Sequence, residues 1–340
     1  MSSSIRILWI DDDYVNHEDD AKNLESEISN LTVEIIHPVD LEKKLKSKIK
    51  KPDLFLVDFF LNQIPAPDGR IFPDRGLTVA GKLKERYPEL PIYGVSHEEK
   101  RGMFDTDAQA AKSVFDKQLT FETVQNDGAK ILYWDARDFR IIRIAEKENI
   151  DALLSTLKAP ESIKDRFQLV LPDALRNGLG TKKEGNSIAF GRWILEKFLP
   201  TPGFLYDDLH AATHLGLTET AFKRISKEKR FKKIKYSGIF SKTSSDLWWV
   251  SELNNLVFSS PKAKKIDSDT TWEIAPSIFG ISGVESSKCV VCNEPYPELV
   301  GINLDDENKL LPVHYRCSEP YPSKKRELFF DEIRGFKVNQ

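Results

Sequence analysis

The sequence predicts an α/β fold, with a doubly wound parallel sheet in the N-terminal part of the chain and smaller modules after it. Two observations support this prediction. Short apolar runs alternate with helical patterns over the first 135 residues, as in strand–helix–strand units with right-handed crossovers. The 340 residues are also too many for one ordinary hydrophobic core, so two or three domains are expected.

Five apolar runs are predicted to be the strands of this sheet, because each is short and closes on polar residues. They are Ile5–Ile10, Val33–Ile36, Leu54–Val57, Ile92–Val95 and Ser113–Phe115. The stretches between them carry the apolar spacing of helices. The predicted helices are Asp19–Ile28, Asp40–Lys48, Gly76–Tyr87 and Asp105–Ala111, with Thr120–Leu132 closing the unit.

Polar residues follow four of these runs. Asp11–Asp13 follow the first, Asp58 the third, Ser96 the fourth and Lys117 the fifth. The carboxyl ends of parallel strands meet at one edge of a sheet, where open α/β sheets bind ligands. Adjacent carboxylates suit Mg²⁺, and Asp58 could act as a carboxylate nucleophile that forms an aspartyl-phosphate. Ser96 and Lys117 would then contact the phosphoryl group.

Residues 5 to about 135 resemble the receiver domain of two-component response regulators, which is flavodoxin-like. The matching segments are Ile7–Asp13, Pro52–Asp58, Pro91–Ser96 and Val114–Lys117. The resemblance implies that Asp58 accepts phosphate from a histidine kinase or another phosphodonor. It also implies Mg²⁺ binding and phosphate sensing. The Mg²⁺ ligands would be Asp11, Asp12, Asp58 and the backbone carbonyl of Phe60, and the phosphate sensors would be Ser96 and Lys117.

The sequence departs from the family's pattern beside this site. His97 follows the hydroxyl residue where a small residue is usual, and Gln118 replaces the proline that usually follows the lysine. The segment between Leu61 and Gly76 is also longer than in the family and contains three prolines. Loops of this length near a site are often functional.

A helix-turn-helix pattern lies between Tyr206 and Ile225. Ala212 would let two helices approach closely, and Gly216 would turn the chain between them. Thr218 is placed to cap the second helix. A mostly helical connector over residues 136–185 precedes this segment, and the helix Asn186–Leu199 opens the second domain.

Basic residues gather after this turn, where Lys223 to Lys235 hold eight Lys or Arg against one Glu. The strand-like segments Lys233–Phe240 and Leu247–Val250 predict a β-hairpin wing, so residues 186–265 look like a winged helix. Its second helix could enter the major groove while the basic run contacts phosphates. The candidate DNA contacts are Thr218, Thr220, Lys223, Arg224, Lys232 and Lys233. Winged helices also bind proteins, and a charge run is often only a solvated surface.

The three cysteines lie close together near the C-terminal end. Cys289 and Cys292 form one short-spaced pair, and His314 and Cys317 form another. Four such ligands suit tetrahedral Zn²⁺ and leave no position open for water, which is typical of a structural site. Residues 266–340 are therefore predicted to be a zinc-binding module, in a reduced compartment rather than a disulfide-forming one.

Two functions fit this organisation. The first is a phosphorylation-switched response regulator, in which the receiver domain (1–135) controls DNA binding by the winged helix and zinc module. The alternative is a signalling adaptor or effector subunit, as in a stress or defence assembly, whose output domains bind proteins or form a homodimer. No catalytic triad or phosphate-binding glycine loop is evident, so no enzyme activity is expected beyond the receiver's own phosphoryl transfer and hydrolysis.

Composition sets the remaining bounds. A net charge of −3 gives no global bias toward nucleic acid, and 40% hydrophobic with 30% charged residues is typical of a globular chain. No apolar stretch reaches membrane-spanning length and no secretory signal precedes the first strand. We therefore expect a cytoplasmic protein with no membrane partner.

Overall fold

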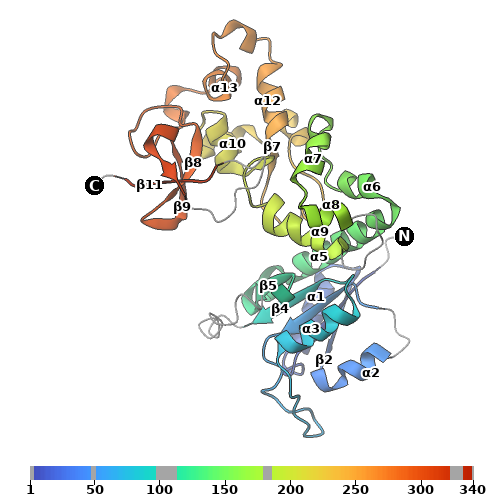
Figure 1. Ribbon diagram of the computed structural model, residues 1–340. Coiled ribbons are helices and arrows are strands. Elements are labelled where there is room, and N and C mark those ends of the chain that lie inside the picture. Colours follow the sequence, from blue (N-terminus) through green and yellow to red (C-terminus); the bar gives the residue numbers. More distant parts are fainter. Residues whose placement is uncertain (1–3, 47–50, 97–112, 179–185, 322–331, 339–340) are drawn as a thin grey trace. The chain divides into compact units, whose positions relative to one another are not determined.

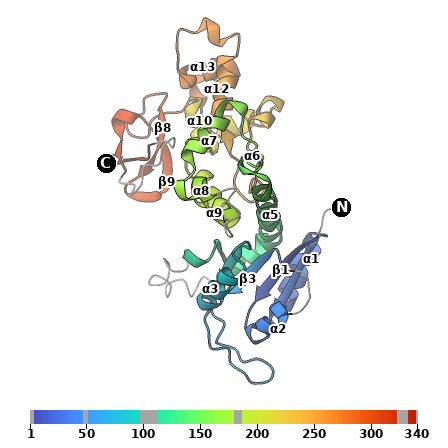
Figure 2. The same cartoon turned by 45° about the vertical axis from the view of Figure 1, so that its right-hand side comes forward.

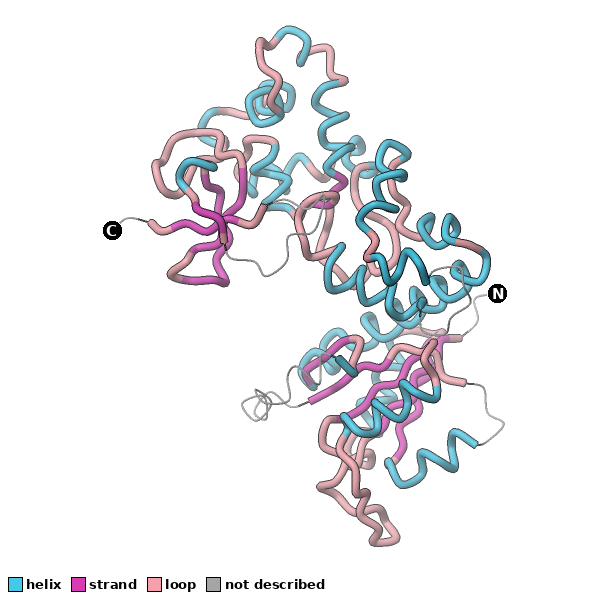
Figure 3. The backbone as a smooth tube through the Cα atoms, viewed as in Figure 1, coloured by secondary structure: helices cyan, strands magenta, loops and turns pink. Residues whose placement is uncertain are grey.

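The structure is a computed structural model that describes residues 4–46, 51–96, 113–178, 186–321 and 332–338 (Figure 1). The chain divides into two compact units. One contains Met1–Thr156 and Asp173–Trp193, and the other contains Leu157–Pro172 and Ile194–Gln340. Figure 3 shows that strands and helices alternate in the first unit, whereas the second is mostly helical with a small sheet toward its C-terminal end.

The first unit is built on a five-stranded, wholly parallel sheet in the order β2-β1-β3-β4-β5. This order is that of a flavodoxin-like doubly wound fold, and it confirms the predicted parallel sheet. The strands are β1 (Ile5–Ile10), β2 (Leu31–Ile36), β3 (Leu54–Asp58), β4 (Ile92–Ser96) and β5 (Lys117–Thr120).

Helices cover both faces of the sheet (Figures 1 and 2). Alternate residues of β1 point to opposite faces, so Trp9 lies against Phe121 on one side while Ile10 joins a core cluster with Val79 on the other. The helices are α1 (Glu18–Glu27), α2 (Leu41–Lys46), α3 (Gly76–Arg86) and α5 (Phe121–Glu148). The first and last of these contact each other, and the other two pack on the opposite face.

The fifth strand begins later than the sequence pattern indicated. The predicted strand Ser113–Phe115 is wrong, because pairing with β4 starts only after Asp116. Asp116 forms two hydrogen bonds with Ile92. Its N–H donates to the Ile92 carbonyl and its carboxylate accepts from the Ile92 N–H, each at 2.8 Å. Phe115 is instead buried against Phe59. The predicted helix Asp105–Ala111 and His97 lie outside the described residues.

The unit is completed by helices that follow α5. Helix α5 runs unbroken to Glu148, well past the predicted end at Leu132. The others are α6 (Ile150–Ser155), α8 (Asp173–Gly178) and α9 (Asn186–Trp193). Helix α9 packs closely on α5, because a Cβ at Gly191 would lie 2.3 Å from the Phe139 ring. The predicted helix Asn186–Leu199 is α-helical only to Trp193 and continues as the π-helix Ile194–Phe198.

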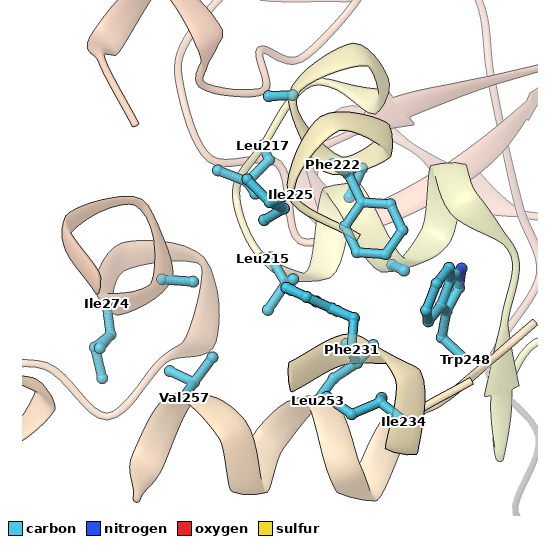
Figure 4. Packing of buried hydrophobic residues seen from close by; sticks show 14 of the residues in the cluster. Leu215, Leu217, Phe222, Ile225, Phe231, Ile234, Trp248, Leu253, Val257 and Ile274 are labelled. Atoms are coloured by element: carbon cyan, nitrogen blue, oxygen red, sulfur yellow. The ribbon is translucent and has the colours of Figure 1, made fainter. Parts of the chain in front are cut away.

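The second unit contains the predicted helix-turn-helix. Gly216 joins α10 (Asp208–His214) to α11 (Glu219–Ile225) with a φ of +68°, and a Cβ there would lie 2.2 Å from the Trp272 carbonyl oxygen. Figure 4 shows Phe222, Phe231 and Trp248 pointing into the core that these helices share. The helices of this unit are α7 (Lys164–Val170), α10 (Asp208–His214), α11 (Glu219–Ile225), α12 (Val250–Phe258) and α13 (Thr271–Phe279).

The predicted β-hairpin wing is reduced to a single bridge. Lys235 bridges Trp248 in the antiparallel sense, and the Tyr236 N–H donates to the Leu247 carbonyl at 2.8 Å. The predicted strand Lys233–Phe240 is therefore wrong in extent, and the two-residue strand β7 (Trp248–Trp249) also pairs with β6 (Leu205–Tyr206). Both tryptophans are buried, and the Trp248 Nε1–H donates to Asp208 Oδ1 at 2.8 Å. The segment is therefore internal, because its aromatic side chains fill the helical core.

A four-stranded sheet in the order β10-β11-β8-β9 follows this core. Its strands are β8 (Leu299–Asn303), β9 (Asp306–Val313), β10 (Glu319–Pro320) and β11 (Arg334–Phe336). Val313 and Phe336 are buried beside Cys289 in a core cluster of only three buried residues. Across the described ranges of both units, no helix is long and apolar enough to cross a bilayer.

Candidate functional site

Three carboxylates meet at the carboxyl edge of the parallel sheet. Asp11 and Asp12 directly follow β1, and Asp58 ends the adjacent strand β3. Each is buried, and ligand oxygens of the three side chains lie within 4.8 Å of one another. The structure thus brings together the three acidic side chains that the sequence singled out. We call them the acidic cluster.

Asp11 carries a buried carboxylate oxygen that no described residue satisfies. Its Oδ1 accepts from the Asp13 N–H at 2.9 Å, whereas its buried Oδ2 has no hydrogen-bond partner among the described residues. Burial raises the pKa of Asp11 to about 6, against a lowering influence of His17. A buried carboxylate oxygen without a partner fits a hard cation such as Mg²⁺, which prefers oxygen ligands.

Asp12 is tied to the long proline-containing loop. Its Oδ2 accepts two backbone hydrogen bonds, from Gln63 at 2.6 Å and Ile64 at 2.7 Å. The Ile64 carbonyl also lies 3.2 Å from His37 Nε2. Sequence reasoning missed these contacts, because a backbone amide carries no residue-type signal and the partners lie 51 and 52 residues apart.

Backbone groups of Phe60 and Gly76 lie directly against Asp58. Its Oδ2 accepts from the Phe60 N–H at 3.0 Å. Helix α3 starts directly against it, because a Cβ at Gly76 would come within 2.0 Å of the Asp58 carbonyl oxygen. Only glycine allows this approach, so Gly76 is a further residue of the site that sequence reasoning did not identify.

Ser96 lies at the same edge of the sheet. Asp58 pairs with Val95 in the register of β3 and β4, so Ser96 is one residue further along, and it is 7% exposed. Across the next strand pair Ser96 faces Thr120, whose hydroxyl accepts from the Thr123 N–H and caps α5. Thr120 thus occupies the edge position where a phosphate-sensing lysine was predicted.

Lys117 is not at this edge, and its predicted placement beside Asp58 is wrong. It pairs with Tyr93, three strand residues or about 10 Å from the level of Ser96. Its Nζ lies 2.9 Å from Oδ2 of Asp135, a fully buried residue of α5. The Tyr93 hydroxyl donates to the same oxygen at 2.8 Å, and burial raises the pKa of Tyr93 well above its ordinary value.

The second unit holds a second candidate metal centre. Ligand atoms of Cys289, Cys292, His314 and Cys317 lie within 4.8 Å of one another. His314 Nδ1 lies 3.2 Å from Cys292 Sγ, while its Nε2 lies 3.1 Å from the Pro295 carbonyl oxygen. That second contact orients the ring as in zinc sites, where the non-ligating nitrogen donates to a carbonyl. We call these four residues the Cys₃His cluster.

The thiols of the Cys₃His cluster differ in acidity. A hydrogen bond from the Glu294 backbone lowers the pKa of Cys292 to about 6, whereas burial raises the pKa of Cys317 to about 11. Asn293 has a φ of +59°, and the Cys289 N–H donates to the Glu294 carbonyl at 2.9 Å, so the chain turns tightly around the first pair. Soft thiolates aimed at one point fit Zn²⁺.

Two of the predicted DNA-contacting side chains, Lys223 and Arg224, form ion pairs within the protein. Lys223 pairs with Glu219 and lies 4.0 Å from Asp208, and Arg224 donates to both carboxylate oxygens of Glu285. The Thr218 N–H donates to the Glu285 carbonyl at 2.8 Å, and the Thr218 hydroxyl caps α11 as predicted. The segment before the Cys₃His cluster therefore packs against the start of the second helix.

The exposed cations of this region that have no acidic partner among the described residues lie further along the chain. Lys232 and Lys233 belong to the 3₁₀ turn Lys229–Lys233, and Lys227 precedes it. Within the part of the chain that the structure describes, no ion pair involves these lysines. Thr220 is exposed on the first turn of α11. The available positive charge is thus centred on the turn rather than on α11.

No protein-family model and no curated protein matches this chain. Similar solved structures include the adenylate cyclase from Rhodopirellula baltica, at 16% identity and a TM-score of 0.33, covering 43% of this chain and 96% of that one. Two response regulator receiver domain proteins are also similar. That from Clostridium thermocellum has 15% identity and a TM-score of 0.30, covering 40% and 96%. That from Methanospirillum hungatei JF-1 has 18% identity and a TM-score of 0.29, covering 41% and 98%.

These likenesses concern about two fifths of the chain and assign it neither an activity nor a partner. The assignment of a doubly wound fold follows from the strand order alone.

Proposed function

We propose that this chain is a signalling protein that is switched by phosphorylation of Asp58. The observation that supports the proposal most strongly is the acidic cluster at the carboxyl edge of the sheet, in which a buried oxygen of Asp11 lacks a hydrogen-bond partner among the described residues. The phosphodonor would be a partner histidine kinase or a small phosphorylated molecule. The chain itself performs only this self-modification and its hydrolysis, with no other enzyme activity.

In the proposed step, a carboxylate oxygen of Asp58 bonds to phosphorus while the donor's P–N or P–O bond breaks and its electron pair stays with the donor. The Phe60 N–H orients the Asp58 carboxylate. Asp11, Asp12 and Asp58, with the Phe60 carbonyl, would hold Mg²⁺, which supplies positive charge against the transferring phosphoryl oxygens. The Ser96 hydroxyl would donate to a phosphoryl oxygen in the modified state only, which makes it a switch contact.

The Cys₃His cluster is proposed to hold structural Zn²⁺. The sheet beside it has few buried apolar side chains, so metal binding would supply much of its folding free energy. All four ligands come from the protein, which leaves no position for a substrate.

The proposed output is binding of duplex DNA through phosphate contacts of the 3₁₀ turn, chiefly Lys232 and Lys233. These lysines are exposed and no ion pair between described residues involves them. The alternative output is protein binding. The ion pairs of Lys223 and Arg224 favour this alternative, because a recognition helix with neutralised cations is poorly suited to DNA.

The phosphorylation proposal is tested by intact-mass spectrometry after treatment with acetyl phosphate and Mg²⁺. We expect the wild-type protein to gain one phosphoryl group, Asp58→Ala to gain none, and Asp13→Asn, which removes a neighbouring acid outside the acidic cluster, to behave as wild type. Omitting Mg²⁺ should suppress the gain. An unmodified wild type, or equal labelling of Asp58→Ala, would overturn the proposal.

A further inference from the structure

A pocket of about 240 Å³ lies within the second unit, apart from the acidic and Cys₃His clusters. Tyr206, Asp207 and Thr213 contribute to one wall, from α10 and the residues before it. Ile302 and Leu310 contribute to an apolar wall from the β8–β9 hairpin. The pocket thus combines a polar helix surface with an apolar strand surface, as ligand sites do.

One buried group in the pocket lacks a partner. Thr213 is 1% exposed, and its Oγ1 makes no hydrogen bond to any described residue. Buried hydroxyls are almost always hydrogen-bonded, and a helical threonine usually bonds to the carbonyl one turn earlier. Because Thr213 lines the pocket, an occupant is the natural source of its missing partner.

The charges around the pocket are mainly negative. Asp207, Glu298 and Glu332 contribute carboxylates to its lining, and Glu332 pairs with Arg334 at 3.3 Å. Asp207 and Glu298 therefore supply the negative charge, against the imidazoles of His210 and His214. Burial raises the pKa of Asp207, but its hydrogen bond with His210 outweighs this and holds the pKa below its ordinary value. Asp207 is therefore ionised at neutral pH, and the pocket suits a positively charged occupant.

The size and shape of the pocket narrow the class of cation. Its volume is below the roughly 300–1,000 Å³ of pockets for drug-sized ligands, so it fits a group of side-chain size. Tyr206 offers an aromatic ring, which lies 5.4 Å from the His214 ring. A planar guanidinium can lie on such a ring while its several N–H groups reach separate acceptors. The apolar wall with Leu310 suits the alkyl chain behind it.

We propose that this pocket binds a guanidinium group on a short alkyl chain, carried by a free small molecule or by an arginine side chain of a partner protein. The guanidinium donates to the carboxylates of Asp207 and Glu298, and the Thr213 hydroxyl donates or accepts a hydrogen bond at the same end. The site is independent of Asp58 and its phosphorylation.

Isothermal titration calorimetry of the full chain tests this proposal with acetyl-arginine amide and its neutral isostere acetyl-citrulline amide. We expect the arginine probe to bind at least tenfold more tightly than the citrulline probe. Agmatine and a Gly-Gly-Arg-Gly-Gly peptide distinguish the sources: tighter binding of the peptide indicates a partner protein, and tighter binding of agmatine a small molecule. No heat with either arginine or agmatine at 10 mM, or equal affinity for the citrulline probe, would overturn the proposal.

Two variants place the binding in this pocket. Glu298→Gln should weaken the arginine probe about tenfold, whereas Glu319→Gln, which removes an exposed carboxylate outside the pocket, should not. Thr213→Val should melt no lower than wild type, because it removes a buried hydroxyl that no described residue satisfies, yet it should bind the probe several-fold more weakly. If both Glu298→Gln and Thr213→Val bind as wild type, the pocket is not the site.

Discussion

The ammonium of Lys117 lies 2.9 Å from the buried carboxylate of Asp135, 18 residues later on α5. The lysine keeps partial access to solvent, but the carboxylate has none. The pair is therefore asymmetric: loss of the lysine leaves a buried negative charge, whereas loss of the carboxylate leaves a cation that can reach water.

Lys117→Met should destabilise the first unit by about 2–4 kcal/mol, since it removes the cation from a buried carboxylate. Urea denaturation measures this free energy of unfolding. Lys130→Met, which replaces an exposed lysine of α5, serves as the control and should change stability by less than about 0.5 kcal/mol. Equal stability of the two variants would show that Lys117 does not pair with Asp135.

The raised pKa of Asp11 predicts that the free energy of unfolding falls as the pH rises, because the buried carboxylate must then ionise. The folded pKa of about 6 exceeds the ordinary value of 3.8, so the stability contribution of this group is complete below about pH 3.8 and is lost as the pH rises through 6. The shift corresponds to about 3 kcal/mol. In the absence of divalent cations, Asp11→Asn should therefore gain up to this amount relative to wild type between pH 4 and pH 8, as measured by urea denaturation.

Two controls accompany the Asp11 experiment. Asp13→Asn should show a much smaller change with pH, because Asp13 is not part of the acidic cluster. Millimolar Mg²⁺ should raise the melting temperature of wild type at pH 8 and leave Asp11→Asn unchanged. A pH-independent difference between Asp11→Asn and wild type would show that the Asp11 carboxylate is not buried as described.

Loss of one thiolate should unfold the C-terminal sheet without unfolding the first unit. Cys292→Ser should lose stoichiometric zinc, measured by elemental analysis, and residues 288–317 should lose amide protection in hydrogen exchange. Glu294→Gln, an exposed neighbour whose side chain is not a ligand, should keep both. Wild-type protein that contains no zinc after expression in zinc-supplemented medium would contradict the assignment.

DNA affinity should depend on the 3₁₀ turn more than on α11. Lys232→Ala with Lys233→Ala should lower the slope of log affinity against log salt by about 2, because each phosphate contact contributes about 0.9. Lys223→Ala with Arg224→Ala should have the smaller effect, since both side chains already have acidic partners. Fluorescence polarisation with a random duplex measures both, and no binding even at low salt would favour the protein-binding output.

The sequence was informative where one residue type carries the chemistry. Asp11, Asp12 and Asp58 end apolar runs of adjacent strands, and the Cys₃His cluster has the spacing of a zinc site, so both groups could be predicted before the structure. The position of Lys117 away from that edge could not be predicted, because the register of β5 depends on the two hydrogen bonds between Asp116 and Ile92. A short apolar run around Phe115 reads equally well as strand or as core packing.

Contacts between segments far apart in the chain could not be predicted from the sequence either. The pairing of Arg224 with Glu285 spans 61 residues, and neither residue alone distinguishes an internal ion pair from a DNA contact. The predicted wing is reduced to the Lys235–Trp248 bridge for a related reason. Trp248 and Trp249 have strong strand propensity, but the helical core buries them and leaves only a two-residue strand.

Asp12 links the position of the proline-containing loop to the affinity of the acidic cluster for a cation. The loop amides donate to the same carboxylate that would bind the cation. If a cation binds more or less tightly when Gln63 and Ile64 hold this carboxylate, the cation must shift the docking equilibrium of the loop by the same factor. If Asp58 is phosphorylated as proposed, reciprocity of this kind would give the first unit a second input besides the phosphodonor. A protein that grips the loop would tune how readily Asp58 is modified, without touching Asp58.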